Sequence, residues 1–185
     1  MRYRPKNFRD ENQEVLNQLA KYNPYIARVY DYPELLLPHP TTENFQELCA
    51  KKNKDSLGDN YPGKVHIEIG CGSGRYLIEW ALKNPQDFFI GLELRYKRLV
   101  LAAKKIQKHK IQNILLLRDR GEFLDEYLPH KSINCLHINF PDPWSKKQNV
   151  NIVFLVQNSL QKCVHIFALA ENYDLRLITW NILNP

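Results

Sequence analysis

The sequence predicts an α/β fold in which helices cover both faces of a parallel sheet. Between residues 64 and 140, short apolar runs alternate with segments of helical periodicity. Glycine or proline punctuates most of the boundaries between them. The chain of 185 residues is 44% hydrophobic and 25% charged, which is ordinary for one globular domain with its own core.

Residues 1–60 are polar and contain scattered prolines, and we interpret them as an N-terminal extension. A short helix is expected within Asp10–Tyr22, because its first turn is acidic and the helix dipole favours acids there. The prolines that then interrupt the chain are Pro33, Pro38 and Pro40. A second short helix and a loop are expected within Asn44–Asn60.

Strands and helices alternate regularly from residue 64 onward. The predicted strands are Val65–Gly70, Asp87–Leu94, Asn113–Asp119 and Ser132–Phe140. The predicted helices are Gly74–Pro85, Tyr96–Lys110 and the shorter Glu122–Leu128. Parallel sheets of this kind bind ligands beyond the carboxyl ends of their strands. We therefore expect the site in the loops that follow Ile69, Leu92, Leu117 and Ile138.

The loop "EIGCGSG" after the first strand has the pattern of a nucleotide-binding turn, with a turn that binds no ligand as the alternative. A dinucleotide fingerprint, G-x-G-x-x-G, counted from Gly70 would need a glycine where Arg75 stands. The spacing is instead G-x-G-x-G, with Glu68 two residues before Gly70 and Gly72 two residues after it. This resembles the cofactor loop of Rossmann-like methyltransferases that use S-adenosylmethionine (SAM), whose sulfonium and ammonium a nearby carboxylate favours.

Acids also follow the second and third strands. Glu93 lies about 20 residues beyond the glycines, the position of an acid that binds ribose hydroxyls. That reading serves NAD and SAM equally, so it indicates an adenosine rather than a reaction. Asp119 follows the third strand, where an acid of the methyltransferase class often meets the adenine amino group. The alternative for each is a solvated loop acid.

The segment "NFPDPW", followed by a basic pair, ends the fourth strand. Together with "EIGCGSG", "GLEL" and the opening "MRYRPKNF", it resembles the bacterial tRNA (guanine-N7-)-methyltransferase family over residues 1–147. The resemblance implies a class I Rossmann-like sheet, SAM as cofactor and tRNA as partner. The reaction implied is methyl transfer to N7 of a guanine in the tRNA variable loop.

Guanine N7 is already a lone-pair nucleophile, so the chemistry needs placement and a dry site rather than a base. By resemblance, Asp142 is the catalytic residue, and it also contacts cofactor and substrate. Its carboxylate can accept hydrogen bonds from the guanine N–H edge. Lys146 matches a substrate-contacting position, and Trp144 either stacks on a base or seals the site. The expected cofactor-binding residues are Glu68, Gly70, Gly72, Glu93, Asp119 and Asp142.

The net charge of +6 and the pI of about 9.1 permit a polyanionic partner, although a lysine excess also aids solubility. The basic residues near the N-terminus form either a tRNA-binding arm or a frayed end. They are Arg2, Arg4, Lys6 and Arg9. The basic face of Tyr96–Lys110 is interpreted as a solvated helix surface.

The four cysteines show no CxxC pair and no zinc spacing, so we expect neither a disulfide scaffold nor a metal site. No signal peptide and no apolar run of membrane length occur. The sequence thus favours a cytoplasmic, monomeric protein without a membrane partner.

The resemblance stops after Lys147, and the 37 residues from Asn149 contain none of the seven glycines. If the reading frame starts at the third letter of each codon from Gln148 onward, the gene can encode the segments that the family would have here. They are a basic run, a helix start PEFL, a Gly-Gly turn and a strand ending in Thr-Asp. We hypothesise that residues 148–185 are an out-of-frame tail, with natural divergence as the alternative. The domains expected are the extension 1–60, the methyltransferase core 61–147 and this tail.

The missing strands would leave the sheet incomplete and the fourth strand at a poorly covered edge. We therefore expect weak or no transfer activity. Two other functions stay open: a non-catalytic RNA-binding remnant that keeps the basic surface, and a nicotinamide-dependent oxidoreductase, which the glycine spacing disfavours.

Overall fold

The computed structural model describes residues 13–52, 63–128 and 132–138. Within this part, strands form one five-stranded sheet in the order β1-β4-β3-β2-β5, and every pairing is parallel. The strands are β1 (Leu36–Leu37), β2 (Val65–Ile69), β3 (Phe88–Leu92), β4 (Ile114–Leu117) and β5 (Cys135–Ile138). The α/β parallel sheet predicted from the sequence is confirmed.

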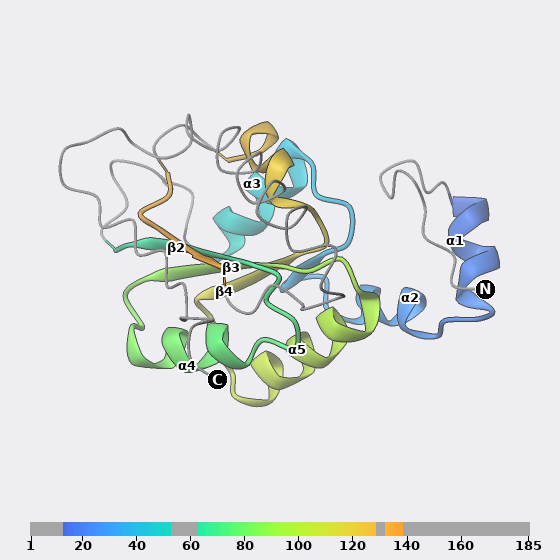
Figure 1. The fold of residues 1–185 in the computed structure, drawn as a ribbon, viewed down its shortest axis with the longest axis horizontal. Coiled ribbons are helices and arrows are strands. Elements are labelled where there is room, and N and C mark those ends of the chain that lie inside the picture. Colours follow the sequence, from blue (N-terminus) through green and yellow to red (C-terminus); the bar gives the residue numbers. More distant parts are fainter. Residues whose placement is uncertain (1–12, 53–62, 129–131, 139–185) are drawn as a thin grey trace, which may run out of the picture.

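Helices cover both faces of the sheet (Figure 1). Helices α4 (Arg75–Lys83) and α5 (Tyr96–Lys108) lie on one face, and α3 (Thr42–Lys51) and the 3₁₀-helix η3 (Gly121–Glu126) lie on the other. Of the N-terminal helices, α2 and η2 pack against α5, and α1 packs against α2. They are α1 (Gln13–Ala20), α2 (Tyr25–Arg28) and the 3₁₀-helix η2 (Val29–Asp31).

Alternation along each strand separates two cores. On β3, Phe88, Ile90 and Leu92 join the core under α3 and η3, whereas Phe89 joins the core under α4 and α5. All four side chains are at most 1% exposed. Because these strands are buried on both faces, their sequences are nearly continuous apolar runs, and this is the pattern that predicted them.

The expected elements differ from the observed ones at their ends, one differs in kind, and α2, η2 and β1 were not predicted. The segment predicted as a short helix at Glu122–Leu128 forms the 3₁₀-helix η3. Strand β1 falls in a stretch that the sequence analysis read as irregular, because two leucines between prolines carry no periodic signal. They become a strand by pairing with β4, Leu36 with Leu116 and Leu37 with Leu117.

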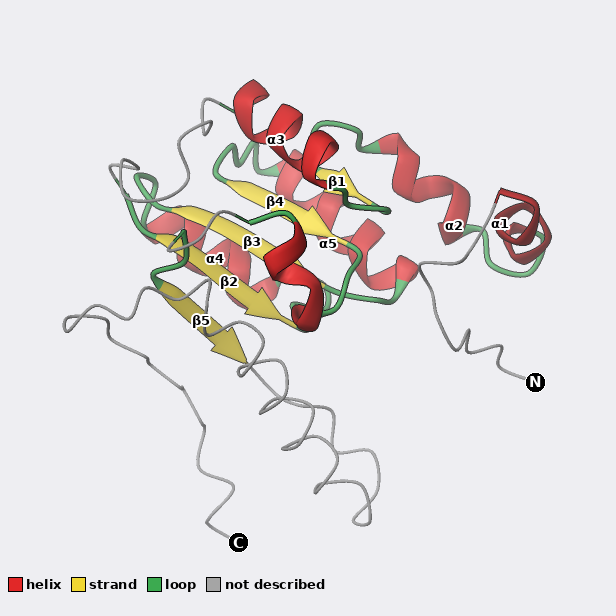
Figure 2. Ribbon diagram, turned by 90° about the horizontal axis from the view of Figure 1, so that it is seen from above, coloured by secondary structure: helices red, strands yellow, loops and turns green. Residues whose placement is uncertain are grey.

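The order of the strands creates one topological switch point in the described sheet. From β2 the chain moves outward through β3 to β4, and it returns to place β5 on the other side of β2 (Figure 2). The connections from β2 and toward β5 therefore diverge at the carboxyl ends of these two strands. Ligands of open α/β sheets bind at such a switch point.

Candidate active site

The strand register aligns the loops that the sequence singled out. Ile69 pairs with Leu92 on one side and with Ile138 on the other, and Leu92 pairs with Leu117. Gly70 and Glu93 each come directly after one of these paired residues. The glycine loop, Glu93 and the end of β5 thus share one edge of the sheet.

At three positions of the glycine loop the backbone has a positive φ, a conformation that glycine adopts without strain. Gly70, Gly72 and Gly74 have φ values of +76°, +57° and +73°. The N–H groups of Gly70 and Cys71 both donate to the Leu92 carbonyl, at 2.8 and 2.9 Å. These bonds fold the start of the loop down onto the end of β3.

A fourth glycine, on β3, makes room for this fold. A Cβ atom on Gly91 would lie 2.6 Å from Leu77 Cδ2 and 2.9 Å from Cys71 Sγ, closer than real Cβ contacts. The Cys71 side chain therefore packs against bare backbone. Burial, followed by the charges of Glu68 and Glu93, raises the pKa of the Cys71 thiol well above its usual value. It is a packing residue, not a nucleophile.

The three expected cofactor acids occupy different environments. Glu68 is buried within β2, with 3% of its surface exposed, and Asp119 is buried after β4 with 2% exposed. The Asp119 Oδ1 atom accepts from the Arg120 N–H at 2.8 Å. Glu93 is half-buried, and its Oε1 accepts from the N–H groups of Leu94 and Arg95, both at 2.9 Å. This carboxylate shapes the turn that leads into α5.

Arg118, which directly follows β4 and precedes Asp119, is a residue near the candidate site that the sequence analysis missed. Its guanidinium lies 3.9 Å from the Tyr96 ring centroid, and its Nε donates to the Leu94 carbonyl at 3.2 Å. The contact ties the end of β4 to the turn after Glu93. A basic residue at the end of an apolar strand is the only sequence signal for it.

Two basic residues of α5 contact the glycine loop. The sequence analysis interpreted the basic face of this helix as a solvated surface, and for these two residues that interpretation is incomplete. Lys105 Nζ donates to the Ser73 carbonyl at 3.0 Å and contacts Ser73 Oγ at 3.3 Å. Arg98 Nη1 lies 3.7 Å from the position that a Cβ of Gly72 would take. Helical periodicity alone does not show which lysines and arginines face the neighbouring loop.

Asp142 and Lys146 lie outside the described residues, as do Trp144 and the N-terminal basic residues at positions 2, 4, 6 and 9. Their roles stay predictions. The strand that precedes Asp142 is nonetheless described, and it ends beside the glycine loop through the pairing of Ile69 with Ile138.

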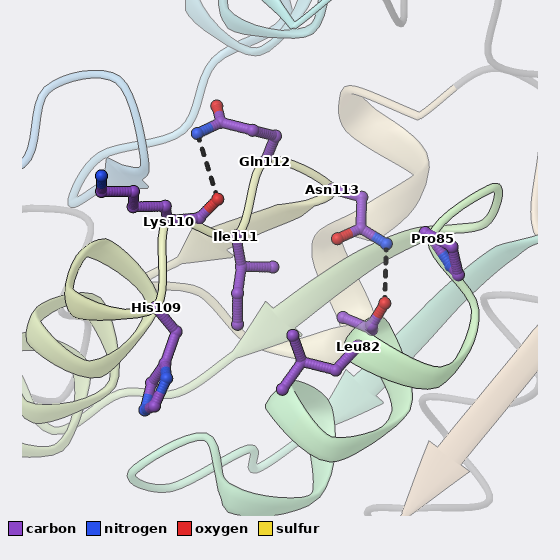
Figure 3. Close-up of a pocket in the computed structure, with 8 residues that line it drawn as sticks. Leu82, Pro85, His109, Lys110, Ile111, Gln112 and Asn113 are labelled. Atoms are coloured by element: carbon purple, nitrogen blue, oxygen red, sulfur yellow. Dashed lines mark hydrogen bonds between the residues drawn. The ribbon is translucent and has the colours of Figure 1, made fainter.

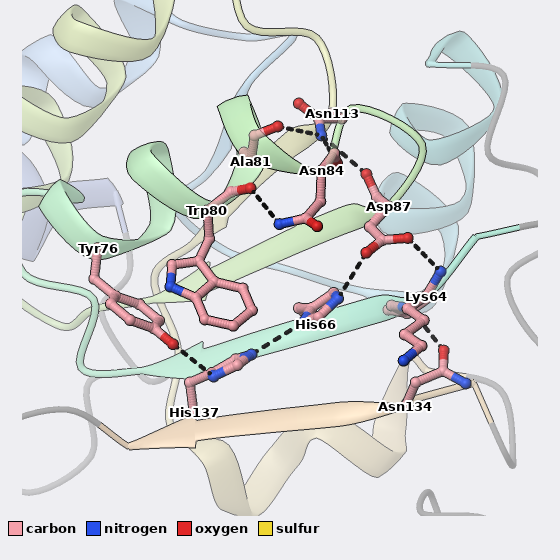
Figure 4. Close-up of polar contacts among 11 residues, drawn as sticks. Lys64, His66, Tyr76, Trp80, Ala81, Asn84, Asp87, Asn113, Asn134 and His137 are labelled. Atoms are coloured by element: carbon pink, nitrogen blue, oxygen red, sulfur yellow. Dashed lines mark hydrogen bonds and ion pairs between the residues drawn. The ribbon is translucent and has the colours of Figure 1, made fainter. Parts of the chain in front are cut away.

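A buried polar chain supports the edge of the sheet under α4 (Figure 4). His66 Nε2 lies 3.1 Å from Asp87 Oδ2, and His66 Nδ1 lies 3.0 Å from His137 Nε2. The Tyr76 hydroxyl lies 3.2 Å from His137 Nδ1. The rings of Phe89 and His137 stack on His66, with centroids at 4.5 and 5.3 Å. The sequence analysis did not identify this chain.

A pocket of about 240 Å³ opens at the other end of the sheet (Figure 3). Its walls include Leu82 at the end of α4, Pro85 just after it, and His109 and Ile111 before β4. These segments precede the amino ends of β3 and β4, so the pocket is remote from the glycine loop. Among the described residues, no group of three or more metal-ligating side chains occurs. No helix in the same part of the chain has the length and apolarity to cross a membrane.

Fold and site together define a Rossmann-like α/β protein with a glycine-rich loop at the switch point of its sheet. Comparison with known proteins places the chain in a family. The family model described as "Putative methyltransferase" matches residues 62–168, more than half of the chain. The chain belongs to this methyltransferase family. The matched range ends inside residues 148–185, where the sequence analysis expects an out-of-frame tail.

Curated relatives align with about three quarters of the chain or slightly less. A bifunctional glycosyltransferase/methyltransferase of Fusobacterium nucleatum is 39% identical over 140 residues, covering 74% of this chain and 21% of the relative. A tRNA (guanine-N(7)-)-methyltransferase of Enterococcus faecalis is 35% identical over 125 residues, covering 68% and 53%. One of Campylobacter jejuni subsp. doylei is 30% identical over 142 residues, covering 77% and 33%. The aligned part therefore spans between a fifth and about half of these relatives.

Proposed function

We propose that this chain is a SAM-dependent tRNA methyltransferase that transfers a methyl group to N7 of a guanine in the variable loop. The observation that carries the proposal is the convergence of the glycine loop, Glu93 and the end of β5 at one switch point. Membership of a methyltransferase family and the names of the relatives support it.

The residues present fit SAM better than a dinucleotide. A dinucleotide needs outward N–H groups for its pyrophosphate, yet the Gly70 and Cys71 amides are bonded to the Leu92 carbonyl. A Cβ placed on Gly70 would meet nothing within 4 Å, so a ligand can approach the backbone there. The Glu68 carboxylate favours the cationic groups of a ligand, and the Glu93 carboxylate can accept hydrogen bonds from ribose hydroxyls.

SAM supplies the electrophilic methyl group on its sulfonium. The chain's own residues then have to bind, orient and keep water out. Glu68 and the glycine loop would hold the amino acid part, Glu93 the ribose and Asp119 the adenine amino group. Asp142 would accept from the guanine N–H edge and aim N7 at the methyl carbon, while Lys146 contacts tRNA phosphate. No group has to remove a proton before attack, because N7 carries a lone pair.

The division of the chain is part of the same proposal. Residues 1–60 extend the core 61–147, and their strand β1 completes the β4 edge of the sheet. Residues 148–185 are the tail whose origin the gene decides. Sequencing independent DNA across the codons of Lys147 and Gln148 tests this point. An uninterrupted reading frame in the present register would remove the frameshift hypothesis.

The activity is tested by calorimetry and by methyl transfer. We expect S-adenosylhomocysteine to bind and NAD to show no heat. We also expect Glu93→Ala to weaken binding at least tenfold, since a charged hydrogen-bond partner contributes about 1.5–3 kcal/mol. The matched control is Glu79→Ala, an exposed acid on α4 that pairs with Arg75. Binding of NAD in place of S-adenosylhomocysteine would refute the proposal.

Transfer of radioactive methyl to unmodified tRNA, followed by nucleoside analysis, tests the substrate. We expect 7-methylguanosine as the product, with low turnover because the out-of-frame tail hypothesised from the sequence would replace the family's last strands. Binding of tRNA without any methylation would instead favour the RNA-binding remnant. Robust turnover would show that the expected C-terminal strands are dispensable.

A further inference from the structure

The Arg98 side chain stands beside the glycine loop without a partner of its own. It lies in the first turn of α5 and is exposed. Its Nη1 atom is 3.7 Å from where a Cβ of Gly72 would be, so the guanidinium rests against the bare backbone of the loop. Within the part of the chain that the structure describes, the Arg98 side chain forms no ion pair and no hydrogen bond.

Other cations around the loop are already engaged. Lys105 donates to the Ser73 carbonyl and contacts its hydroxyl. The Arg75 Nε donates to Glu79 Oε1 at 3.2 Å. Arg118 is held by the Leu94 carbonyl and the Tyr96 ring. Of these residues, Arg98 is the one whose charge is available to a ligand.

The acids beside the loop explain why a ligand with a carboxylate would need the positive charge of Arg98. SAM ends in an amino acid group that carries an ammonium and a carboxylate as well as the nearby sulfonium. Glu68 would face the cationic centres and Glu93 the ribose, and the negative field of both carboxylates reaches into the loop, where it acts on the Cys71 thiol. The same field repels a carboxylate unless a cation offsets it.

We propose that Arg98 binds the α-carboxylate of the methyl donor and thereby selects donors that carry this carboxylate. The inference rests on the proposed function, and it names a contact that the resemblance did not supply. Glycine at position 72 leaves the space that a side chain would occupy, so guanidinium and ligand can meet over the same backbone. A planar guanidinium suits a carboxylate because it donates two parallel hydrogen bonds.

The test compares the binding of two ligands to the full chain, to a variant of Arg98 and to a control variant. Calorimetry measures the binding of SAM and of decarboxylated SAM to the full chain and to Arg98→Gln. For the full chain we expect SAM to bind tighter than decarboxylated SAM by about tenfold or more. Arg98→Gln should lose that preference by weakening SAM alone. Lys104→Gln, which removes an exposed charge from the same helix, should preserve it.

Arg98→Lys adds a check on geometry, because it keeps the charge and removes the planar fork. We expect a preference between that of the full chain and that of Arg98→Gln. Thermal melting should show all three variants folded like the parent, since both side chains are exposed.

The outcomes separate the two proposals. Equal weakening of both ligands by Arg98→Gln, or no weakening of either, would overturn the role of Arg98 and leave the proposed function standing. Failure of the full chain to bind either ligand would overturn the proposed function, and this inference with it.

Discussion

Both faces of the sheet have an apolar core, but only the face under α4 adds a buried chain of hydrogen-bonded side chains in the described part of the molecule. Under α3 and η3, the core consists of apolar and aromatic side chains such as Phe45, Ile67 and Leu124. Under α4, next to the edge strand of the described sheet, a buried polar chain runs from Asp87 through His66 and His137 to Tyr76. Apolar packing depends on volume and tolerates small shifts, whereas a hydrogen-bonded chain depends on donors and acceptors that match one by one.

The polar chain has a defined direction. With the Asp87 carboxylate oxygen as acceptor, a neutral His66 imidazole donates from Nε2 and accepts at Nδ1. His137 then donates from Nε2 and accepts at Nδ1 from the Tyr76 hydroxyl. Burial lowers the pKa of both imidazoles, which favours their neutral forms, and in this direction all four ring nitrogens have partners. This arrangement joins β5, β2 and α4 close to the candidate active site.

The largest effect is expected on the apolar face. Phe45 is 1% exposed and packs against Tyr127, with ring centroids 5.4 Å apart. Phe45→Ala should lower the free energy of unfolding by about 4 kcal/mol, because it removes apolar contacts and leaves a cavity. Urea denaturation measures it. Leu82→Ala, at a leucine that is 56% exposed, should change stability by less than about 0.5 kcal/mol. Similar losses in the two variants would contradict the assignment of the core.

The next effect concerns the end of the polar chain. Asp87→Leu leaves two donors without an acceptor, the His66 imidazole and the Lys64 N–H. We expect a loss of about 3 kcal/mol of stability. Asp87→Asn is the informative control: its amide can donate to His66 and accept from Lys64, so both histidines can switch tautomer and reverse the chain. Stability of Asp87→Asn well above that of Asp87→Leu would support this; equal losses would argue against it.

Acid should weaken the polar face before the apolar one. Burial and the neighbouring His66 lower the pKa of His137 to about 4, and burial lowers that of His66, opposed by Asp87. The folded state then binds fewer protons than the unfolded state, so stability present above about pH 6.5 is lost as pH falls. We expect Tm to drop several degrees from pH 7.5 to 5. His137→Phe should flatten this dependence; an unchanged slope would refute it.

The smallest effect is expected at a solvent-exposed cap on the apolar side. Thr41 Oγ1 accepts from the Asn44 N–H at 3.3 Å, and the Thr41 N–H donates to Asn44 Oδ1 at 2.8 Å, forming a capping box for α3. Thr41→Ala should cost about 1 kcal/mol, and Thr41→Ser much less, since serine keeps the oxygen. Water can replace an exposed partner but not a buried one. A loss as large as that of Asp87→Leu would break the comparison.

The strands were readable because they are buried on both faces. Their continuous apolar runs, such as "DFFIGLEL", end in the glycine and acid positions that the register then aligns. Strand β1 was not readable, because Leu36 and Leu37 acquire their conformation from β4. Likewise, nothing in the local sequence of His66 or His137 distinguishes a hydrogen-bonded pair 71 positions apart from two ordinary strand residues.

By itself, the sequence determined the α/β class, the alternation of strands and helices that implies a parallel sheet, and the glycine spacing that indicates the candidate site. Periodicity and backbone conformation are local properties, so they can be read from neighbouring residues. The tertiary structure alone decided that Arg98 rests on the glycine loop, that Gly91 admits Cys71, and that Asp87, His66 and His137 form one chain. These contacts join segments that only the packing of helices on the sheet brings together.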